Sequence, residues 1–136
     1  TAYRRQRQMC IRDRYKSSHT MDAQIAYAVN QINAHEGKIS ISHLMDEVNL
    51  CQRHFERKFK LHTGFTPQRY NSIVRFKNAI KILRNESFDN LLSVAVKAGY
   101  YDASHLSREI KKLSGSTPNF FLSLPLDNET TIIYTK

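Results

Sequence analysis

The sequence predicts an all-α protein of about seven helices, built as two similar halves joined by a long connecting helix. Apolar residues recur at intervals of three and four, which is typical of amphipathic helices. The chain also repeats itself: residues 55–70 match residues 106–121 at an offset of 51, and residues 41–50 match residues 91–100 at an offset of 50. A unit of about 50 residues is therefore used twice, with one residue inserted in the second copy.

The composition limits the classes of protein to which the chain can belong. A chain of 136 residues with 40% hydrophobic residues and a net charge of +9 fits one small domain or two, with a polyanionic partner. No apolar run approaches the ~18–20 residues of a membrane span. Cys10 and Cys51 form no disulfide framework, so we expect a reduced, intracellular protein.

Residues 1–19 carry six Arg or Lys and one Asp. Because this leader lacks apolar periodicity, we expect it to be disordered or foreign to the natural protein rather than a nucleic-acid-binding arm.

The first half is expected to form three helices, over about residues 21–35, 41–48 and 51–63. Ser40 can cap the second helix. Asn49 tolerates the left-handed backbone required where that helix ends, and Gly64 ends the third helix. The apolar residues expected to point inward from the third helix are Phe55, Phe59 and Leu61.

The connecting helix begins at Thr66-Pro67, where a hydroxyl N-cap precedes a proline at the first helical position. It is expected to run to about Arg84. Its apolar residues cover too much of the circumference for one stripe, and they are Tyr70, Ile73, Val74, Phe76, Ala79, Ile80, Ile82 and Leu83. A helix between two small cores would show this distribution.

The second half repeats the plan of the first. Asp89 and Asp102 are the expected caps of helices over about residues 91–98 and 103–113, with Gly99 in the turn between them. A last short helix starts at Thr117-Pro118. The expected divisions are a leader at 1–19, a first subdomain at 20–65, the connecting helix at 66–86, a second subdomain at 87–124 and a tail at 125–136.

Each half contains two short helices joined by a tight turn, and the second helix is basic on its outer face. This is the pattern of a helix-turn-helix, whose second helix can lie in the major groove of DNA. Residues 91–121 read L-x-x-V-A-x-x-A-G-Y-x-D-A-S-H-L-S-R-x-I-K-K-x-x-G-x-T-P-x-x-F. On these residues, the stretch 22–124 resembles the DNA-binding domain of the AraC/XylS family of bacterial transcription regulators. In departures from the family pattern, Asn49 and Cys51 stand where Gly and a capping Ser are frequent, and Ile110 and Phe121 replace Phe and Tyr.

The resemblance implies two helix-turn-helix units that bind double-stranded DNA in a sequence-specific manner. It also implies a bacterial transcription regulator, cytoplasmic and nucleoid-associated, that acts as an activator and requires no cofactor. RNA polymerase is a further candidate partner. The chain does not begin with Met, which favours a piece of a longer regulator over a stand-alone one, and an N-terminal effector or dimerisation domain would then be another partner.

The outer faces of the two recognition helices supply the candidate site. Arg is the commonest reader of guanine, and Glu can accept from cytosine N4; by the resemblance, Arg53, Glu56 and Arg57 occupy base-contacting positions. The alternative is that both arginines only pair with Glu56 or solvent. The expected base contacts are Gln52, Arg53, Glu56, Arg57, Ser104, Ser107 and Arg108. The expected phosphate contacts are Lys58, Lys60, His105, Lys111 and Lys112.

The two helices are expected to share the work unequally. Side chains on the second helix are shorter, so we expect it to rely on phosphate and shape readout, with specificity mainly from residues 52–60 and anchoring from residues 103–112. The connecting helix of about 18 residues spans roughly 27 Å, which approaches the ~34 Å between successive major-groove faces. Both recognition helices could then enter adjacent grooves.

Other functional classes find less support in the sequence. Asp102, Ser104 and His105 are near neighbours on one helix and cannot form a nucleophile–base–orienter line, so no enzyme is expected. No metal site is expected, because the spacing of His43, Cys51 and His54 is not that of a zinc finger. The main alternative is a helical protein- or RNA-interaction module, although the exposed aromatic groups typical of RNA recognition are not evident.

Overall fold

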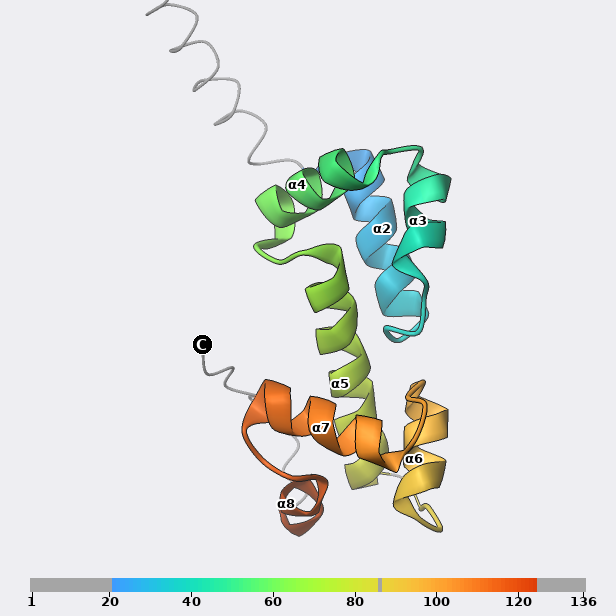
Figure 1. The fold of residues 1–136 in the computed structure, drawn as a ribbon, viewed down its shortest axis with the longest axis vertical. Helices are drawn as coiled ribbons and strands as arrows, with labels where there is room; N and C mark the ends of the chain where they lie inside the picture. The colour runs from blue at the N-terminus through green and yellow to red at the C-terminus, as the bar shows by residue number, and fades with distance from the viewer. Residues whose placement is uncertain (1–20, 86, 125–136) are drawn as a thin grey trace, which may run out of the picture. The chain divides into compact units, whose positions relative to one another are not determined.

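The computed structural model describes residues 21–85 and 87–124, and in this part of the chain it contains seven α-helices and no strand (Figure 1). They are α2 (Ala23–Ala34), α3 (Ile41–Val48), α4 (Gln52–Thr63), α5 (Pro67–Asn85), α6 (Leu91–Ala98), α7 (Ala103–Ser114) and α8 (Pro118–Ser123). The predicted all-α class is confirmed. The predicted leader and tail lie outside the described residues. None of the described helices is long and apolar enough to cross a membrane.

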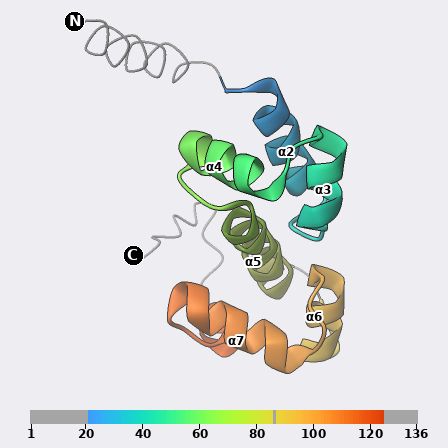
Figure 2. The ribbon, with the colours of Figure 1, turned by 45° about the horizontal axis from the view of Figure 1, so that its top comes forward.

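The described residues form two compact units. The first unit comprises residues 21–31 and 40–67, with α3, α4 and most of α2. The second comprises Ile32–Ile39 and the described residues from 68 to 124, with α6, α7, α8 and nearly all of α5. In each unit two helices are joined by a short turn, α3 to α4 and α6 to α7 (Figures 1 and 2).

The first unit buries the inward faces of its three helices. Phe55 and Phe59 are fully buried, and their ring centroids lie 5.6 Å apart. The inward position expected for Leu61 is wrong, because its side chain is 66% exposed. Leu61 follows Phe59 by two residues, which is about 200° around an α-helix and places it on the opposite side. The other buried apolar residues of this unit are Ile25, Ala28, Ile41, Leu44, Val48 and Pro67.

The second unit has one apolar cluster, to which α5 contributes a broad surface. Phe76 of α5 meets Phe121 of α8 edge to face, with ring centroids 6.2 Å apart. The cluster explains why apolar residues occupy so much of the circumference of α5. Its buried members are Phe76, Ala79, Ile80, Ile82, Leu83, Val94, Ala95, Ala98, Tyr100, Leu106, Ile110, Leu113 and Phe121.

The two turns confirm the inserted residue. Asn49 and Gly99 end α3 and α6 in the left-handed conformation, with φ of 55° and 86°. Residues 49–51 separate α3 from α4, whereas residues 99–102 separate α6 from α7. The turns therefore differ by the one residue that changes the repeat offset from 50 to 51.

The helix caps mostly follow the sequence. Ser40 Oγ accepts a hydrogen bond from the His43 N–H (3.5 Å), and Asp102 Oδ1 accepts one from the His105 N–H (2.6 Å), as predicted. The cap predicted at Asp89 is wrong. Asn90 directly precedes α6, and its Oδ1 accepts from the N–H three residues later at 2.9 Å, which is the reach of an N-cap side chain.

The helices α4 and α7 end with the same local bonding. The Thr63 hydroxyl donates to the carbonyl four residues before it (2.8 Å) and accepts from the N–H two residues after it (3.2 Å). Ser114, 51 residues later, does the same at 2.7 and 3.1 Å. Gly64 and Gly115 then end the helices with φ of 80° and 76°. The repeat thus extends to individual hydrogen bonds.

Candidate nucleic-acid interface

The outer face of α4 is the most basic exposed surface of the first unit. Phe55 and Phe59 fix which side of the helix is buried, and Arg57 lies close to the opposite side because it is two residues from each of them. Arg53 lies one turn before Arg57, and both side chains are exposed. Lys60 is exposed on the same side.

The two arginines of α4 make no internal ion pair among the described residues and are exposed to solvent. Glu56 Oε1 accepts a hydrogen bond from Gln52 Nε2 at 2.9 Å. Among the described residues, Arg53 and Arg57 have no hydrogen-bond or ion-pair partner. The pairing of these arginines with Glu56 that the sequence left open is therefore not present in this structure. Two guanidinium groups and one oriented carboxylate face outward together.

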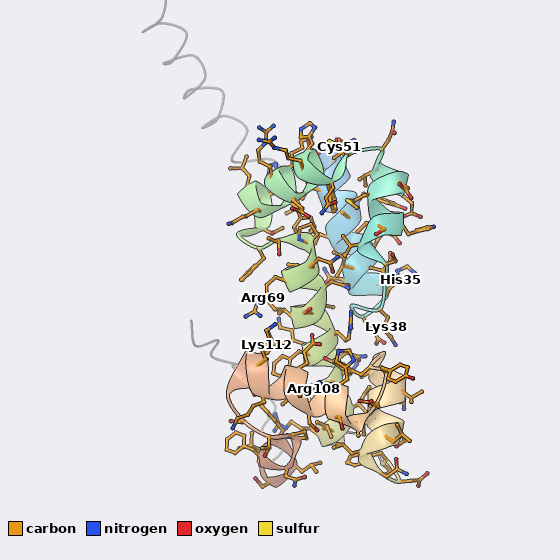
Figure 3. All side chains as sticks on the ribbon, in the orientation of Figure 1. His35, Lys38, Cys51, Arg69, Arg108 and Lys112 are labelled. Atoms are coloured by element: carbon orange, nitrogen blue, oxygen red, sulfur yellow. The ribbon has the colours of Figure 1, made fainter. Side chains whose placement is uncertain are left out.

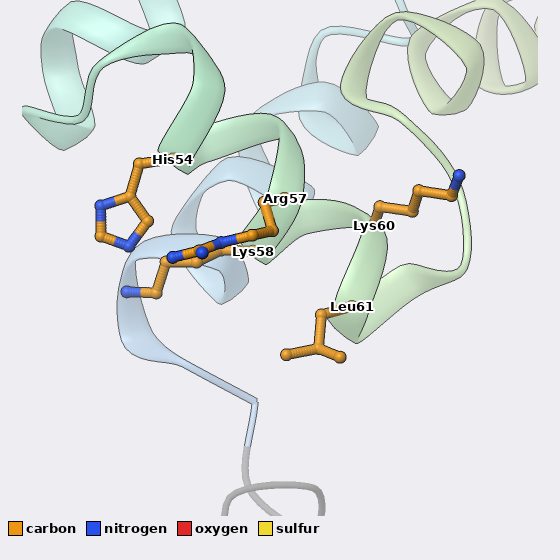
Figure 4. Close-up of a pocket in the computed structure, with 5 residues that line it drawn as sticks. All are labelled: His54, Arg57, Lys58, Lys60 and Leu61. Atoms are coloured by element: carbon orange, nitrogen blue, oxygen red, sulfur yellow. The ribbon is translucent and has the colours of Figure 1, made fainter. Parts of the chain in front are cut away.

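The surface around α4 contains two hollows that share Arg57 and Lys60. One is lined by Gln52, Arg53, Glu56, Arg57, Lys60 and Thr66. The other is lined by His54, Arg57, Lys58, Lys60 and Leu61, and Figure 4 shows these side chains. Of these residues, His54 and Leu61 were not among the contacts predicted from the sequence. Their spacing of three and four residues from Arg57 was the available signal.

Lys58 differs from the other basic residues of α4 because its ammonium group points into its own unit. Lys58 Nζ lies 2.9 Å from Asp22 Oδ2 and 3.2 Å from Gln24 Oε1. The hydrogen bond from Lys58 is the main cause that lowers the pKa of Asp22. Because the folded-state pKa is depressed, the stabilisation is present at neutral pH and is lost as the pH falls through that lowered value. Lys58 thus ties α4 to the start of α2, and the predicted phosphate contact would have to compete with these bonds.

The outer face of α7 offers less side-chain reach than that of α4. The Ser107 hydroxyl donates to the Ala103 carbonyl at 2.8 Å, within its own helix. Arg108 Nε donates to the Ser104 carbonyl at 3.3 Å, although its side chain is exposed. Both groups are therefore partly satisfied by the backbone of α7 itself.

His105 is engaged inside the second unit through both ring nitrogens. The Tyr101 N–H donates to His105 Nδ1 (3.4 Å), and His105 Nε2 lies 3.5 Å from a carboxylate oxygen of Glu109. The ring also meets the buried Tyr100 ring edge to face at 5.2 Å. Burial raises the pKa of Tyr100 above its usual range, and the Arg75 guanidinium lies 5.5 Å from the ring centroid. The predicted phosphate contact of His105 would have to compete with these bonds.

Basic side chains from two helices gather on the second unit. A hollow between α5 and α7 is lined by Arg69, Ser72, His105, Arg108, Glu109, Lys112 and Leu113. Figure 3 labels Arg69 at the start of α5 together with Arg108 and Lys112 of α7. Arg69 was not among the predicted contacts, because it belongs to the helix that the sequence presented only as a connector. Lys111 is exposed beside Lys112.

Two of the residues considered for catalysis make hydrogen bonds or ion pairs within the second unit. Asp102 caps α7 with the oxygen that accepts from the His105 backbone, and the His105 ring faces Glu109. Within residues 21–85 and 87–124, no group of three His, Cys, Asp or Glu side chains could hold a metal ion. Cys51 is exposed at the N-cap of α4 and makes no capping hydrogen bond.

Comparison with known proteins places this geometry among DNA-binding domains. Residues 44–123 match the family described as "Helix-turn-helix domain". The "HTH-type transcriptional activator RhaS" of Pectobacterium carotovorum is 30% identical over 112 residues, which cover 82% of this chain and 39% of that protein. The chain therefore spans about two fifths of the length of this curated relative.

Solved structures show the same fold. The C-terminal domain of AraT, a response regulator from Geobacillus stearothermophilus, superposes with a TM-score of 0.71 at 18% identity, covering 82% of this chain and 93% of that one. The DNA-binding domain of AdpA, a global transcriptional factor in complex with a target DNA, superposes with a TM-score of 0.68 at 20% identity, covering 75% and 92%.

Proposed function

The chain belongs to the AraC/XylS family of helix-turn-helix DNA-binding domains, and on that premise we propose that it binds a specific double-stranded DNA sequence and regulates transcription. The observation that carries the proposal is the outer face of α4. Arg53 and Arg57 are exposed there without an internal partner, beside a Glu56 carboxylate oriented by Gln52. Exposed arginines on the second helix of a helix-turn-helix are suited to bidentate contact with guanine O6 and N7 in the major groove.

In this proposal α4 supplies most of the sequence discrimination. Gln52 and Arg53 lie in the first turn of α4, the part of a recognition helix that contacts base edges. Glu56 can accept a hydrogen bond from cytosine N4 if the Gln52 amide moves to a neighbouring base. Lys60 is then placed for a phosphate at the edge of the groove.

The role of α7 is mainly to anchor the duplex and fix its register. Ser104, Ser107 and Arg108 can add base contacts, but two of these side chains already bond to the helix backbone. Lys111 and Lys112 are exposed near the C-terminal end of α7 and suit phosphate oxygens. In this proposal the recognition helices of the two units enter successive major grooves of one duplex.

A further part of the proposal concerns the regulation of transcription, and it rests on the longer relatives that this chain matches. The matched relative is named a transcriptional activator, and an activator role for this chain, with RNA polymerase as a contact, follows by analogy. An effector or dimerisation domain preceding the described residues, and a cytoplasmic location on the bacterial nucleoid, belong to the same proposal.

Selection of bound sequences from a random duplex pool, using the full 136-residue chain, tests the proposal. We expect a defined consensus, a footprint with two protected segments about one helical turn apart, and affinity that falls steeply with salt. A chain that enriches no sequence, or that prefers RNA of the same sequence to the duplex, would refute specific DNA binding and favour the helical interaction module.

A further inference from the structure

Leu61 is exposed on a recognition helix whose other large apolar side chains are fully buried. Its side chain is 66% exposed, whereas Phe55 and Phe59 are 0% exposed. The fold therefore gains little from a leucine at this position. A single exposed leucine needs no partner for stability, but this one lines a hollow with the basic side chains of α4, where a bound polyanion would meet it.

The surroundings of Leu61 restrict what that partner can be. Leu61 shares its hollow with His54, Arg57 and Lys60, as Figure 4 shows, and the ammonium of the adjoining Lys58 is held at 2.9 Å by Asp22. An apolar protein surface would have to bury these cationic groups unpaired, which is costly. A polyanion that carries a small apolar group satisfies both requirements. The 5-methyl group of thymine is the apolar group that a DNA duplex displays in its major groove.

We propose that Leu61 contacts a thymine 5-methyl group and so extends the base-reading face of α4 beyond the flank formed by Arg53, Glu56 and Arg57. This inference rests on the proposed DNA-binding function and adds a specificity-determining residue to it. Leu61 lies four residues after Arg57, which is about 6 Å along the helix and about 40° around it. At a base-pair rise of about 3.4 Å, the thymine lies within about two base pairs of the base that Arg57 reads.

The second recognition helix provides an internal comparison. The position equivalent to Leu61 at the offset of 51 is Lys112, an exposed residue that lines the basic hollow of the second unit with Arg69 and Arg108. The same register position therefore faces outward in both helices. A lysine there suits a phosphate oxygen, whereas a leucine suits a methyl group.

Replacing thymine by deoxyuridine, one position at a time, tests the contact because it removes only the 5-methyl group. With the full chain and its selected duplex, we expect one position near the Arg57 base to lose about three- to fivefold in affinity, the scale of one buried methyl group. In Leu61→Ala that deoxyuridine penalty should disappear. Leu92→Ala, which truncates another exposed leucine on α6, should retain the full penalty, and thermal unfolding should confirm that both variants are folded.

The outcomes separate this inference from the function on which it rests. If no sequence is selected from the random pool, the proposed function fails first. If a consensus is selected but carries no thymine on either strand within three base pairs of the Arg57 base, the contact is refuted. A flat deoxyuridine scan, or a penalty that persists in Leu61→Ala, also overturns it while leaving specific DNA binding intact.

Discussion

The two recognition helices share a scaffold and differ in what they display. In α4 the outward positions include Arg53 and Glu56, and at the equivalent positions α7 has Ser104 and Ser107. The α4 side chains reach outward, whereas the Ser107 hydroxyl bonds to its own helix. Arg occurs at the next shared position in both, as Arg57 and Arg108, but only the Arg108 Nε donates to a carbonyl of its own helix.

The buried positions and the C-terminal ends of α4 and α7 are similar, because core packing and backbone geometry constrain them. Phe59 and Ile110 are both fully buried, and Thr63 and Ser114 make the same two hydrogen bonds. An outward residue carries no such constraint, so under the proposed function its identity can follow the DNA contact alone. The duplicated fold therefore does not require duplicated recognition.

The largest expected effect on stability comes from truncating buried residues at equivalent positions of α4 and α7. Phe59→Ala should lower the free energy of unfolding by about 3–5 kcal/mol and Ile110→Ala by about 2–5 kcal/mol, because each leaves a cavity in a small core. Urea unfolding followed by circular dichroism measures both. A loss below about 1 kcal/mol for either variant would break the claim that the two interiors are equally constrained.

The next effect sharpens the difference between the outer faces. Arg57→Ala should cost about 1–3 kcal/mol of binding free energy on the selected duplex and relax specificity at one base position. Arg108→Ala should cost less and change the consensus less. Binding titrations on the consensus duplex and on single-base variants measure both. Equal losses of specificity in the two variants would contradict the unequal division of base reading.

The sequence was sufficient for the features that depend on local chemistry. Helical periodicity, the Ser40 and Asp102 caps and the left-handed Asn49 and Gly99 could all be read from it. The N-cap of α6 was wrongly predicted at Asp89 because Asp and Asn are both good N-caps and stand next to each other here. Only the observed start of the helix at Leu91 distinguishes Asp89 from Asn90.

The candidate site was less predictable because it depends on which partner each polar side chain finds. Lys58 looks like a phosphate contact in the sequence, but its ammonium meets Asp22, which is 36 residues away along the chain. His105 likewise uses both ring nitrogens internally. Leu61 was assigned inward by its apolar character alone, although its angular position about α4 places it outside.

A smaller effect should appear at the start of the two recognition helices. Cys51 and Asp102 are equivalent N-caps, but only Asp102 makes a side-chain capping bond. Asp102→Ala should therefore destabilise the protein by about 1 kcal/mol, and Cys51→Ser should stabilise it by up to about 1 kcal/mol. Thermal and urea unfolding of the two variants test this. No gain from Cys51→Ser would show that the serine hydroxyl fails to reach the His54 N–H.

The smallest expected effect is the loss of a single phosphate contact. It distinguishes an exposed lysine from one whose ammonium group is already held within the protein. Lys111→Ala should weaken binding to all duplexes to a similar extent and reduce the slope of log affinity against log salt by about one, because one phosphate contact is lost. Lys58→Ala is the matched comparison, since the Lys58 ammonium already lies on Asp22 and Gln24. We expect it to leave the salt slope unchanged while lowering stability. If Lys58→Ala instead reduced the slope as much as Lys111→Ala, the ion pair with Asp22 would have to open on binding, and the basic face of α4 would extend further than this structure places it.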